Sequence, residues 1–202
     1  MTEQLFLMDT NIVSLMGRTL PPPGLRQWLL DVGVRRLALS YPAIAVLLRG
    51  AHLLERQNPR KSEEIKAWVG RVLATDFPFL DMTTEVAFIY ARMTAVPELR
   101  HMWTVQRHQK QNRLGHDLMI AAVAIAHKVP ILTDNVADFL TIQRIFKLPG
   151  LYHPLTSQWH VPALYEARLP VLRLAHPEPS EQALPRLDGD RDSGAPGVTS
   201  AP

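Results

Sequence analysis

Short apolar runs alternate with longer segments of helical periodicity along most of this sequence, and this alternation is the feature that most restricts its fold. Residues 5–8, 36–39, 77–80 and 129–132 are typical of short buried strands. The segments between them repeat apolar residues at a spacing of three to four positions, as helices do. We therefore predict an α/β fold: a three-layer sandwich with a mainly parallel central sheet flanked by helices.

The predicted helices fill the remainder of the first 150 residues. They cover residues 12–16, 25–30, 41–54, 61–73, 83–96, 117–127 and 136–146. The segment 117–127 is apolar almost all round, which predicts a buried helix. Residues 151–152 are expected to add an edge strand.

Length and composition define one domain with an extension. The chain has 202 residues, of which 47% are hydrophobic and 20% are charged, as expected for a globular protein with one proper core. Seven of the 17 prolines lie from Pro162 onward. We place the domain in residues 1–158 and a Pro-rich extension in residues 159–202, largely disordered beyond about residue 174 because little apolar surface remains there.

Several classes of protein are disfavoured by what the sequence lacks. No apolar run reaches the roughly 20 residues of a membrane span, and no secretory signal precedes the first strand. We therefore expect a cytoplasmic protein without membrane contact. Cysteine is absent, so a metal would have to be bound by oxygen or imidazole ligands.

Three polar segments stand beside apolar core and need an explanation. Asp9, Thr10 and Asn11 follow the first strand, Asp117 opens the buried helix, and residues 133–138 follow a later strand. Each carboxylate has a simple alternative role as a helix cap or as a charge near a helix N-terminus. In a parallel sheet, however, the carboxyl ends of strands gather at one edge, where ligands bind. Carboxylates brought together there would repel one another unless a cation lay between them.

The same segments resemble a known family. Residues 6–14 (FLMDTNIVS), 115–122 (GHDLMIAA) and 132–139 (LTDNVADF) are similar, in order and separation, to acidic segments of PIN-domain proteins, in particular the VapC and FitB toxin–antitoxin ribonucleases. The resemblance covers roughly residues 5–154. Any one segment is weak, but three in sequence are fairly specific. The implied fold is a PIN-like sandwich.

The resemblance implies a set of site residues. Asp9, Asp117, Asn135 and Asp138 correspond to catalytic positions. Asp9, Asp117 and Asp138 would bind Mg²⁺ or Mn²⁺, the cations that hard oxygen ligands favour. Asn11 and Thr133 would assist as auxiliary residues. Asp134 occupies a position that varies in the family and is left out.

The second acidic motif of the family is degenerate in this chain. The family has a hydroxyl residue, then Glu three positions later, and here Ala43 and Val46 occupy these places. Glu55 is nine residues beyond Val46 and cannot substitute from the same helix turn. Losing a residue that positions the attacking water would lower the rate by about 10²–10⁴. One metal ion remains feasible, and a two-metal route becomes doubtful.

A basic segment is the second functional signal. No carboxylate lies between Glu98 and Asp117, whereas the interval contains Trp103 and the cations Arg100, Arg107, Lys110 and Arg113. Basic and aromatic side chains together suit an RNA backbone with bases to stack on. A solvated surface explains the same charges, and the net charge of +3 permits nucleic-acid binding without requiring it.

The sequence therefore leads to three hypotheses. The first is a metal-dependent endoribonuclease of the PIN-domain toxin type with reduced activity, a hydrolase acting on RNA phosphodiester bonds. By analogy with the family it would form a homodimer and bind an antitoxin protein. The second is a catalytically degenerate PIN-like module that binds RNA or a protein partner. The third is an unrelated α/β domain whose acidic residues cap helices and bind no metal.

Overall fold

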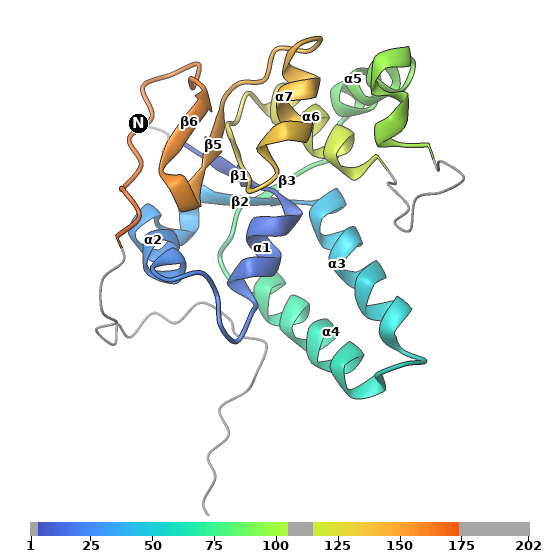
Figure 1. Cartoon of the computed structure of the whole chain (residues 1–202), viewed down its shortest axis with the longest axis vertical. Coiled ribbons are helices and arrows are strands. Elements are labelled where there is room, and N and C mark those ends of the chain that lie inside the picture. Colours follow the sequence, from blue (N-terminus) through green and yellow to red (C-terminus); the bar gives the residue numbers. More distant parts are fainter. Residues whose placement is uncertain (1–3, 105–114, 174–202) are drawn as a thin grey trace, which may run out of the picture.

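The strands form a single sheet in the computed structural model, which describes residues 4–104 and 115–173 (Figure 1). In these residues the sheet has six strands in the order β3-β2-β1-β4-β5-β6. The strands are β1 (Phe6–Met8), β2 (Leu37–Ser40), β3 (Phe79–Leu80), β4 (Ile131–Leu132), β5 (Leu151–His153) and β6 (Gln158–Val161). β1 to β5 are parallel to their neighbours, and β6 pairs antiparallel with β5. The predicted α/β class with a mainly parallel sheet is confirmed.

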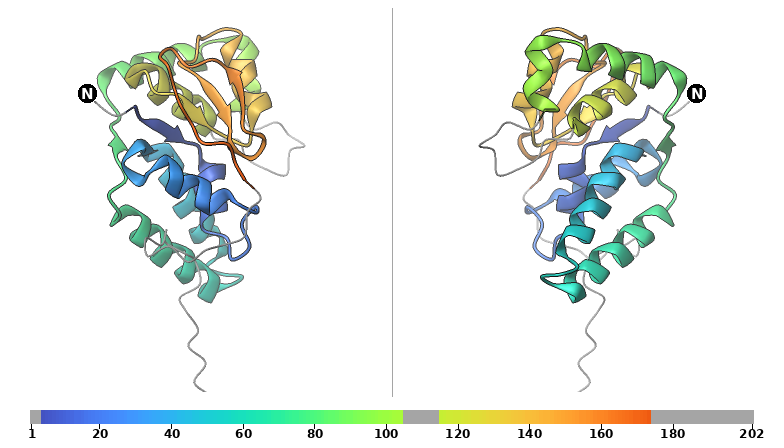
Figure 2. Two further views of the ribbon diagram at one scale, coloured as in Figure 1. Left: turned by 90° about the vertical axis from the view of Figure 1, so that its left-hand side faces the viewer. Right: turned by 90° about the vertical axis from the view of Figure 1, so that its right-hand side faces the viewer.

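Helices cover both faces of this sheet, so the molecule has three layers (Figures 1 and 2). α1 (Thr10–Met16), α2 (Leu25–Val32), α3 (Tyr41–Leu54) and α4 (Pro59–Leu73) lie on one side. α5 (Thr84–Thr94), α6 (His116–His127) and α7 (Val136–Gln143) lie on the other. Short 3₁₀ turns occur at Val34–Arg36, Pro97–Met102 and Pro154–Thr156. Within residues 4–104 and 115–173, no helix combines the length and the apolar character of a membrane span.

Strand geometry divides the core into two halves. Successive side chains of a strand point to opposite faces of the sheet. In β1, Leu7 joins a cluster with α5, α6 and α7, whereas Phe6 and Met8 join a second cluster with α1, α2 and α4. All three side chains are fully buried. Because both faces of β1 are covered, the chain leaves this strand with its next residue, Asp9, already inside the protein.

The segment after β5 differs from the sequence prediction. Residues 151–152 were expected to form an edge strand, but β6 pairs on the outer side of β5 and forms the edge itself. The chain then runs across α2, where Nε1 of Trp28 donates to the carbonyl of Pro170 at 2.6 Å. The backbone N–H of Leu172 donates to Oγ of Ser157 at 2.8 Å. The predicted domain boundary at residue 158 remains a prediction, and the expected disorder beyond residue 174 concerns residues outside the described ranges.

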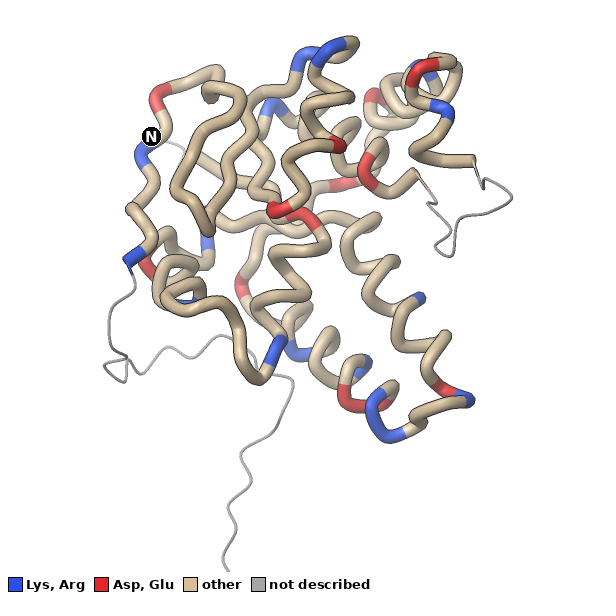
Figure 3. Tube along the Cα trace, viewed as in Figure 1, with Lys and Arg blue, Asp and Glu red and all other residues tan. Residues whose placement is uncertain are grey.

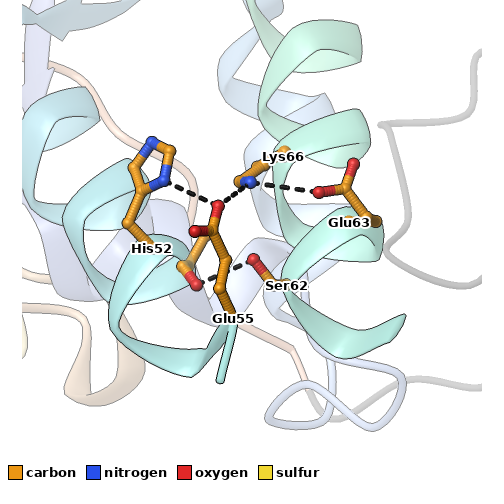
Figure 4. Close-up of polar contacts among 6 residues, drawn as sticks. His52, Glu55, Ser62, Glu63 and Lys66 are labelled. Carbon is orange, nitrogen blue, oxygen red and sulfur yellow. Dashed lines mark hydrogen bonds and ion pairs between the residues drawn. The ribbon is translucent and has the colours of Figure 1, made fainter. Parts of the chain in front are cut away.

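A polar network fastens α3 to α4 (Figure 4). On the inner side, Oγ of the buried Ser62 donates to the carbonyl of Ala51 at 2.8 Å. On the outer side, Lys66 of α4 pairs with Glu55 directly after α3 and, at 3.0 Å, with Glu63. The two helices are thereby held as one unit, and this unit forms a wall of the pocket described below.

Candidate active site

Two polar segments meet at the carboxyl ends of β1 and β4. These strands are parallel neighbours, so the residues that follow them lie side by side at one edge of the sheet. The backbone N–H of Asp9 donates to the carbonyl of Leu132 at 3.0 Å. Beyond this contact, Oγ1 of Thr133 donates to Oδ2 of Asp9 at 2.7 Å. The sheet therefore connects the first and last predicted acidic segments directly.

Asp9 is a buried carboxylate, and its surroundings destabilise its ionised form. It is only 2% exposed. Burial is the largest cause that raises its pKa, the negative charges of Asp117 and Asp138 add to the rise, and hydrogen bonds from Thr133 and Thr10 oppose it, so that the pKa lies at about 7. Oδ1 accepts the backbone N–H of Thr10 at 2.6 Å, so Asp9 also caps α1. The capping alternative is thus correct for Asp9, but capping does not account for its closeness to two other carboxylates.

Asn135 joins the remaining two predicted acids. It precedes α7, yet its side chain makes no capping hydrogen bond. Instead, Nδ2 donates to Oδ2 of Asp138 at 2.8 Å and to Oδ2 of Asp117 at 3.5 Å. Its backbone N–H donates to Oγ1 of Thr133 at 2.9 Å. The Asn135 side chain therefore does not cap α7, and its amide instead bridges carboxylates from α6 and α7.

The auxiliary residues complete a continuous hydrogen-bonded chain. Nδ2 of Asn11 donates to Oγ1 of Thr133 at 3.1 Å, and Oδ1 of Asn11 accepts the backbone N–H of Asp134 at 3.2 Å. Thr133 is fully buried and in turn donates to Asp9. Its hydroxyl proton is committed to Asp9 because the oxygen already accepts two N–H groups. This chain fixes the orientation of the Asp9 carboxylate.

A pocket of about 480 Å³ opens beside these residues. Its polar end is formed by Asp9, Asn11, Asp117 and Asn135. Its other wall comes from α3 and α4 and is apolar, with Val46, Leu47, Ala51, Leu54, Ile65 and Trp68. Figure 3 shows the corresponding gathering of acidic positions near the centre of the molecule, where β1 leads into α1. Val46 therefore lines the same pocket as the acids, while Ala43 is buried in the core.

The oxygen ligands at the acidic end of the pocket suit one hard cation that keeps part of its water shell, and they are too few to surround an ion completely. Among residues 4–104 and 115–173, no three His, Asp or Glu side chains have the geometry of a metal site. Asp9 and Asp117 nevertheless both face the pocket, and Asn135 adds an amide beside them. Mg²⁺ commonly retains several waters and uses only one or two protein carboxylates. These residues are sufficient for that mode of binding, and a positive ion would relieve the repulsion that raises the pKa of Asp9.

The structure describes one of the four predicted RNA-binding cations. His116, half-buried at the start of α6, has its pKa lowered by burial and by the charge of Arg49 on α3. Arg100 is exposed in the turn Pro97–Met102. The other three predicted RNA-binding cations, Arg107, Lys110 and Arg113, lie outside the described residues. RNA binding by this group remains a prediction.

Sequence reasoning missed one pair at the same sheet edge. Nε2 of His153, at the end of β5, lies 2.9 Å from Oδ1 of Asp134. The resemblance assigns no role to Asp134 or to His153. The only available signal was the position of both residues at the ends of adjacent parallel strands.

Solved structures with a similar fold support this architecture. The sequence matches no protein-family model and no curated protein. Its structure is similar to FitAB bound to an IR36 DNA fragment, with 22% identity over 77% of this chain and 99% of that one and a TM-score of 0.53. It is also similar to VapBC2 from Rickettsia felis bound to a promoter DNA fragment, with 20% identity, the same two coverages and a TM-score of 0.51. FitAcB from Neisseria gonorrhoeae gives 23% identity over 68% and 92% of the two chains and a TM-score of 0.50.

The chain has a PIN-like fold. The mainly parallel sheet with helices on both faces agrees with the PIN-like sandwich that the resemblance implies. At these identities the likeness concerns the fold. The chemistry of this chain has to be argued from its own pocket.

Proposed function

We propose that this protein is a metal-dependent endoribonuclease of the PIN-domain toxin type, with reduced activity. The observation that carries the proposal is the convergence of Asp9, Asp117 and Asn135 at one end of the pocket, with Asp138 hydrogen-bonded to the Asn135 amide behind them. Clustered carboxylates carry a cost in stability, because each raises the free energy of ionising its neighbours. A cluster kept at such a cost is typical of a functional site.

The residues of this chain would share the work as follows. Thr133 and Thr10 orient the Asp9 carboxylate, and Asn135 holds Asp117 and Asp138 in fixed relation. A divalent cation bound at the pocket-facing carboxylates would polarise a phosphoryl oxygen and lower the pKa of a coordinated water. The apolar wall excludes water from one side of the pocket and strengthens every charge interaction within it.

The test compares cleavage of single-stranded RNA by the wild type, Asp9→Asn and Asp81→Asn in Mg²⁺ or Mn²⁺. Asp81 is exposed and lies outside the pocket, so its variant controls for the loss of one carboxylate. We expect cleavage by the wild type and by Asp81→Asn and none by Asp9→Asn. Equal cleavage by all three variants would remove the assignment of Asp9 to the site.

A second candidate function is supported by the pocket wall. Val46 lines the pocket at the place where the family's glutamate is expected, so a catalytically degenerate module that binds RNA or a protein partner has a specific observation in its favour. Val46→Glu separates the two candidates. A large gain in cleavage from a weak wild type identifies a dormant site, whereas a wild type that already cleaves rapidly excludes the degenerate alternative.

Partners and location belong to the same proposal. We infer a cytoplasmic homodimer that cleaves RNA and binds an antitoxin protein. The support for an antitoxin partner is the fold shared with VapBC2 and FitAB, which were solved bound to DNA fragments. Co-expression with a neighbouring small open reading frame, followed by size-exclusion chromatography, would test both the antitoxin and the dimer.

A further inference from the structure

The turn that follows β4 is held from two sides. On its inner side, the side chains of Thr133 and Asn135 contact the acidic residues, and the backbone N–H of Asp134 donates to Asn11. On its outer side lies the end of β5, because the backbone N–H of Thr133 donates to the carbonyl of Tyr152 at 3.1 Å. The next residue of β5 is His153. Strand register therefore places this imidazole against the turn.

Both ring nitrogens of His153 have partners. Nε2 lies 2.9 Å from Oδ1 of Asp134, and Nδ1 lies 2.8 Å from Oγ1 of Thr156. An ionised carboxylate only accepts hydrogen bonds, so Nε2 carries the proton and donates to Asp134. The side chain of His153 is 17% exposed, against 44% for Asp134. The imidazole is thus the more buried member of the pair, and contacts at both ring nitrogens hold it in place.

We propose that His153 is a positioning residue, which acts through Asp134 to hold the 133–135 turn in the orientation that presents Thr133 and Asn135 to the carboxylates. For its effect on RNA cleavage, this inference rests on the proposed function. His153 does not touch the pocket. Residues that orient a site's own ligands change activity or metal affinity by about 10–100-fold when removed.

Three variants test the contact. His153→Ala removes the donor to Asp134, while His153→Gln retains an N–H near the position of Nε2. We expect His153→Ala to lower kcat for RNA cleavage about 10-fold or more with little change in KM, and His153→Gln to recover most of the loss. His160→Ala is the matched control, because His160 is an exposed neighbouring imidazole with its ring centroid 6.2 Å from that of His153. It should behave as the wild type.

A double-mutant cycle tests whether the effect passes through Asp134. Asp134→Ala removes an exposed side chain and gives a variant that folds even if His153→Ala does not. We expect Asp134→Ala to reproduce the loss of kcat, and the double variant to be no worse than either single one. Additive losses, or His153→Gln as impaired as His153→Ala, would overturn the proposal.

A structural measurement separates this inference from the proposed function. In ¹H–¹⁵N spectra without metal, His153→Ala and Asp134→Ala should shift the side-chain amide signals of Asn135, and His153→Gln and His160→Ala should not. If the wild type cleaves no RNA but these shifts occur, the proposed function fails and the positioning role stands. Unchanged Asn135 signals in His153→Ala would refute the positioning role whatever the activity.

Discussion

Asp9→Asn should make the metal-free protein more stable at alkaline pH while removing its activity. The pKa of the Asp9 carboxyl group is raised from its ordinary value of 3.8 to about 7 in the folded protein, mainly because the group is buried. A difference of this size corresponds to about 4 kcal/mol of lost stability once the group is ionised in both states. Asparagine carries no charge and avoids that loss.

The sign follows from proton binding. Between pH 3.8 and about 7, the folded protein holds a proton on Asp9 that the unfolded chain has released, so its free energy of unfolding falls as pH rises. Below this window the carboxyl is neutral in both states, and above it the full cost is present. The stability of Asp9→Asn relative to the wild type should therefore increase by about 2–3 kcal/mol between pH 5 and pH 8.

Asp9→Asn also lowers the stability by an amount that does not depend on pH. Oγ1 of Thr133 accepts N–H groups from Asn11 and Asn135, so its own proton must be donated to residue 9. An asparagine that turns its NH₂ group toward Thr133 leaves this proton unpaired and loses about 1–2 kcal/mol. This cost in stability is the same at pH 5 and pH 8. It therefore cancels when the stability difference between Asp9→Asn and the wild type at one pH is subtracted from that at the other.

The assay is urea unfolding followed by circular dichroism, at pH 5 and pH 8, in EDTA. Asp81→Asn serves as the control, because its exposed side chain should give the same difference from the wild type at both pH values. Adding Mn²⁺ at pH 8 should stabilise the wild type in proportion to the logarithm of its concentration and leave Asp9→Asn nearly unchanged. If the free energy of unfolding of Asp9→Asn differs from that of the wild type by the same amount at pH 5 and pH 8, this would falsify the claim that ionised Asp9 destabilises the folded protein.

Three further outcomes are expected from the same structure. Asp117→Asn should lower the pKa of Asp9, because the charge of Asp117 is the second largest cause of its rise; carboxyl ¹³C titration by NMR measures this shift. Gly17→Ala should destabilise the protein by about 1–3 kcal/mol, because the added Cβ would lie 2.5 Å from Cζ2 of Trp68; the urea midpoint reports this. Ser62→Ala should cost about 1–2 kcal/mol by the same assay, because it removes the buried hydrogen bond from α4 to α3.

The sequence predicted the layers of the fold better than its edges. Strands buried on both faces, such as β1, appear as unbroken apolar runs and are easy to recognise. β6 was missed because Gln158 and His160 are exposed and only Val161 is buried, so its four residues have little apolar signal. α1 begins at Thr10 rather than at residue 12 because the Asp9 carboxylate accepts the first backbone N–H of the helix.

The candidate site was also predicted only in part. The position directly after a predicted strand was sufficient to select Asp9 and the segment around Asn135, because neighbouring parallel strands end at one edge of the sheet. It was not sufficient for His153, whose contact with Asp134 depends on the register of β4 against β5. Register is set by the packing of whole strands and is not written in any short motif.

Val46 lies on the wall of the pocket that Asp9 faces, so its side chain bears on the charge balance there. Val46 offers Asp9 neither charge nor hydrogen bond, and burial is the largest cause of the Asp9 pKa shift. A glutamate there would add a third repelling charge facing the pocket and would raise the demand for a cation. Valine removes that repulsion, which stabilises the metal-free state but leaves fewer oxygen ligands for an ion. Valine at this position therefore favours the stability of the metal-free protein over metal binding, as stability and activity commonly oppose each other at functional sites.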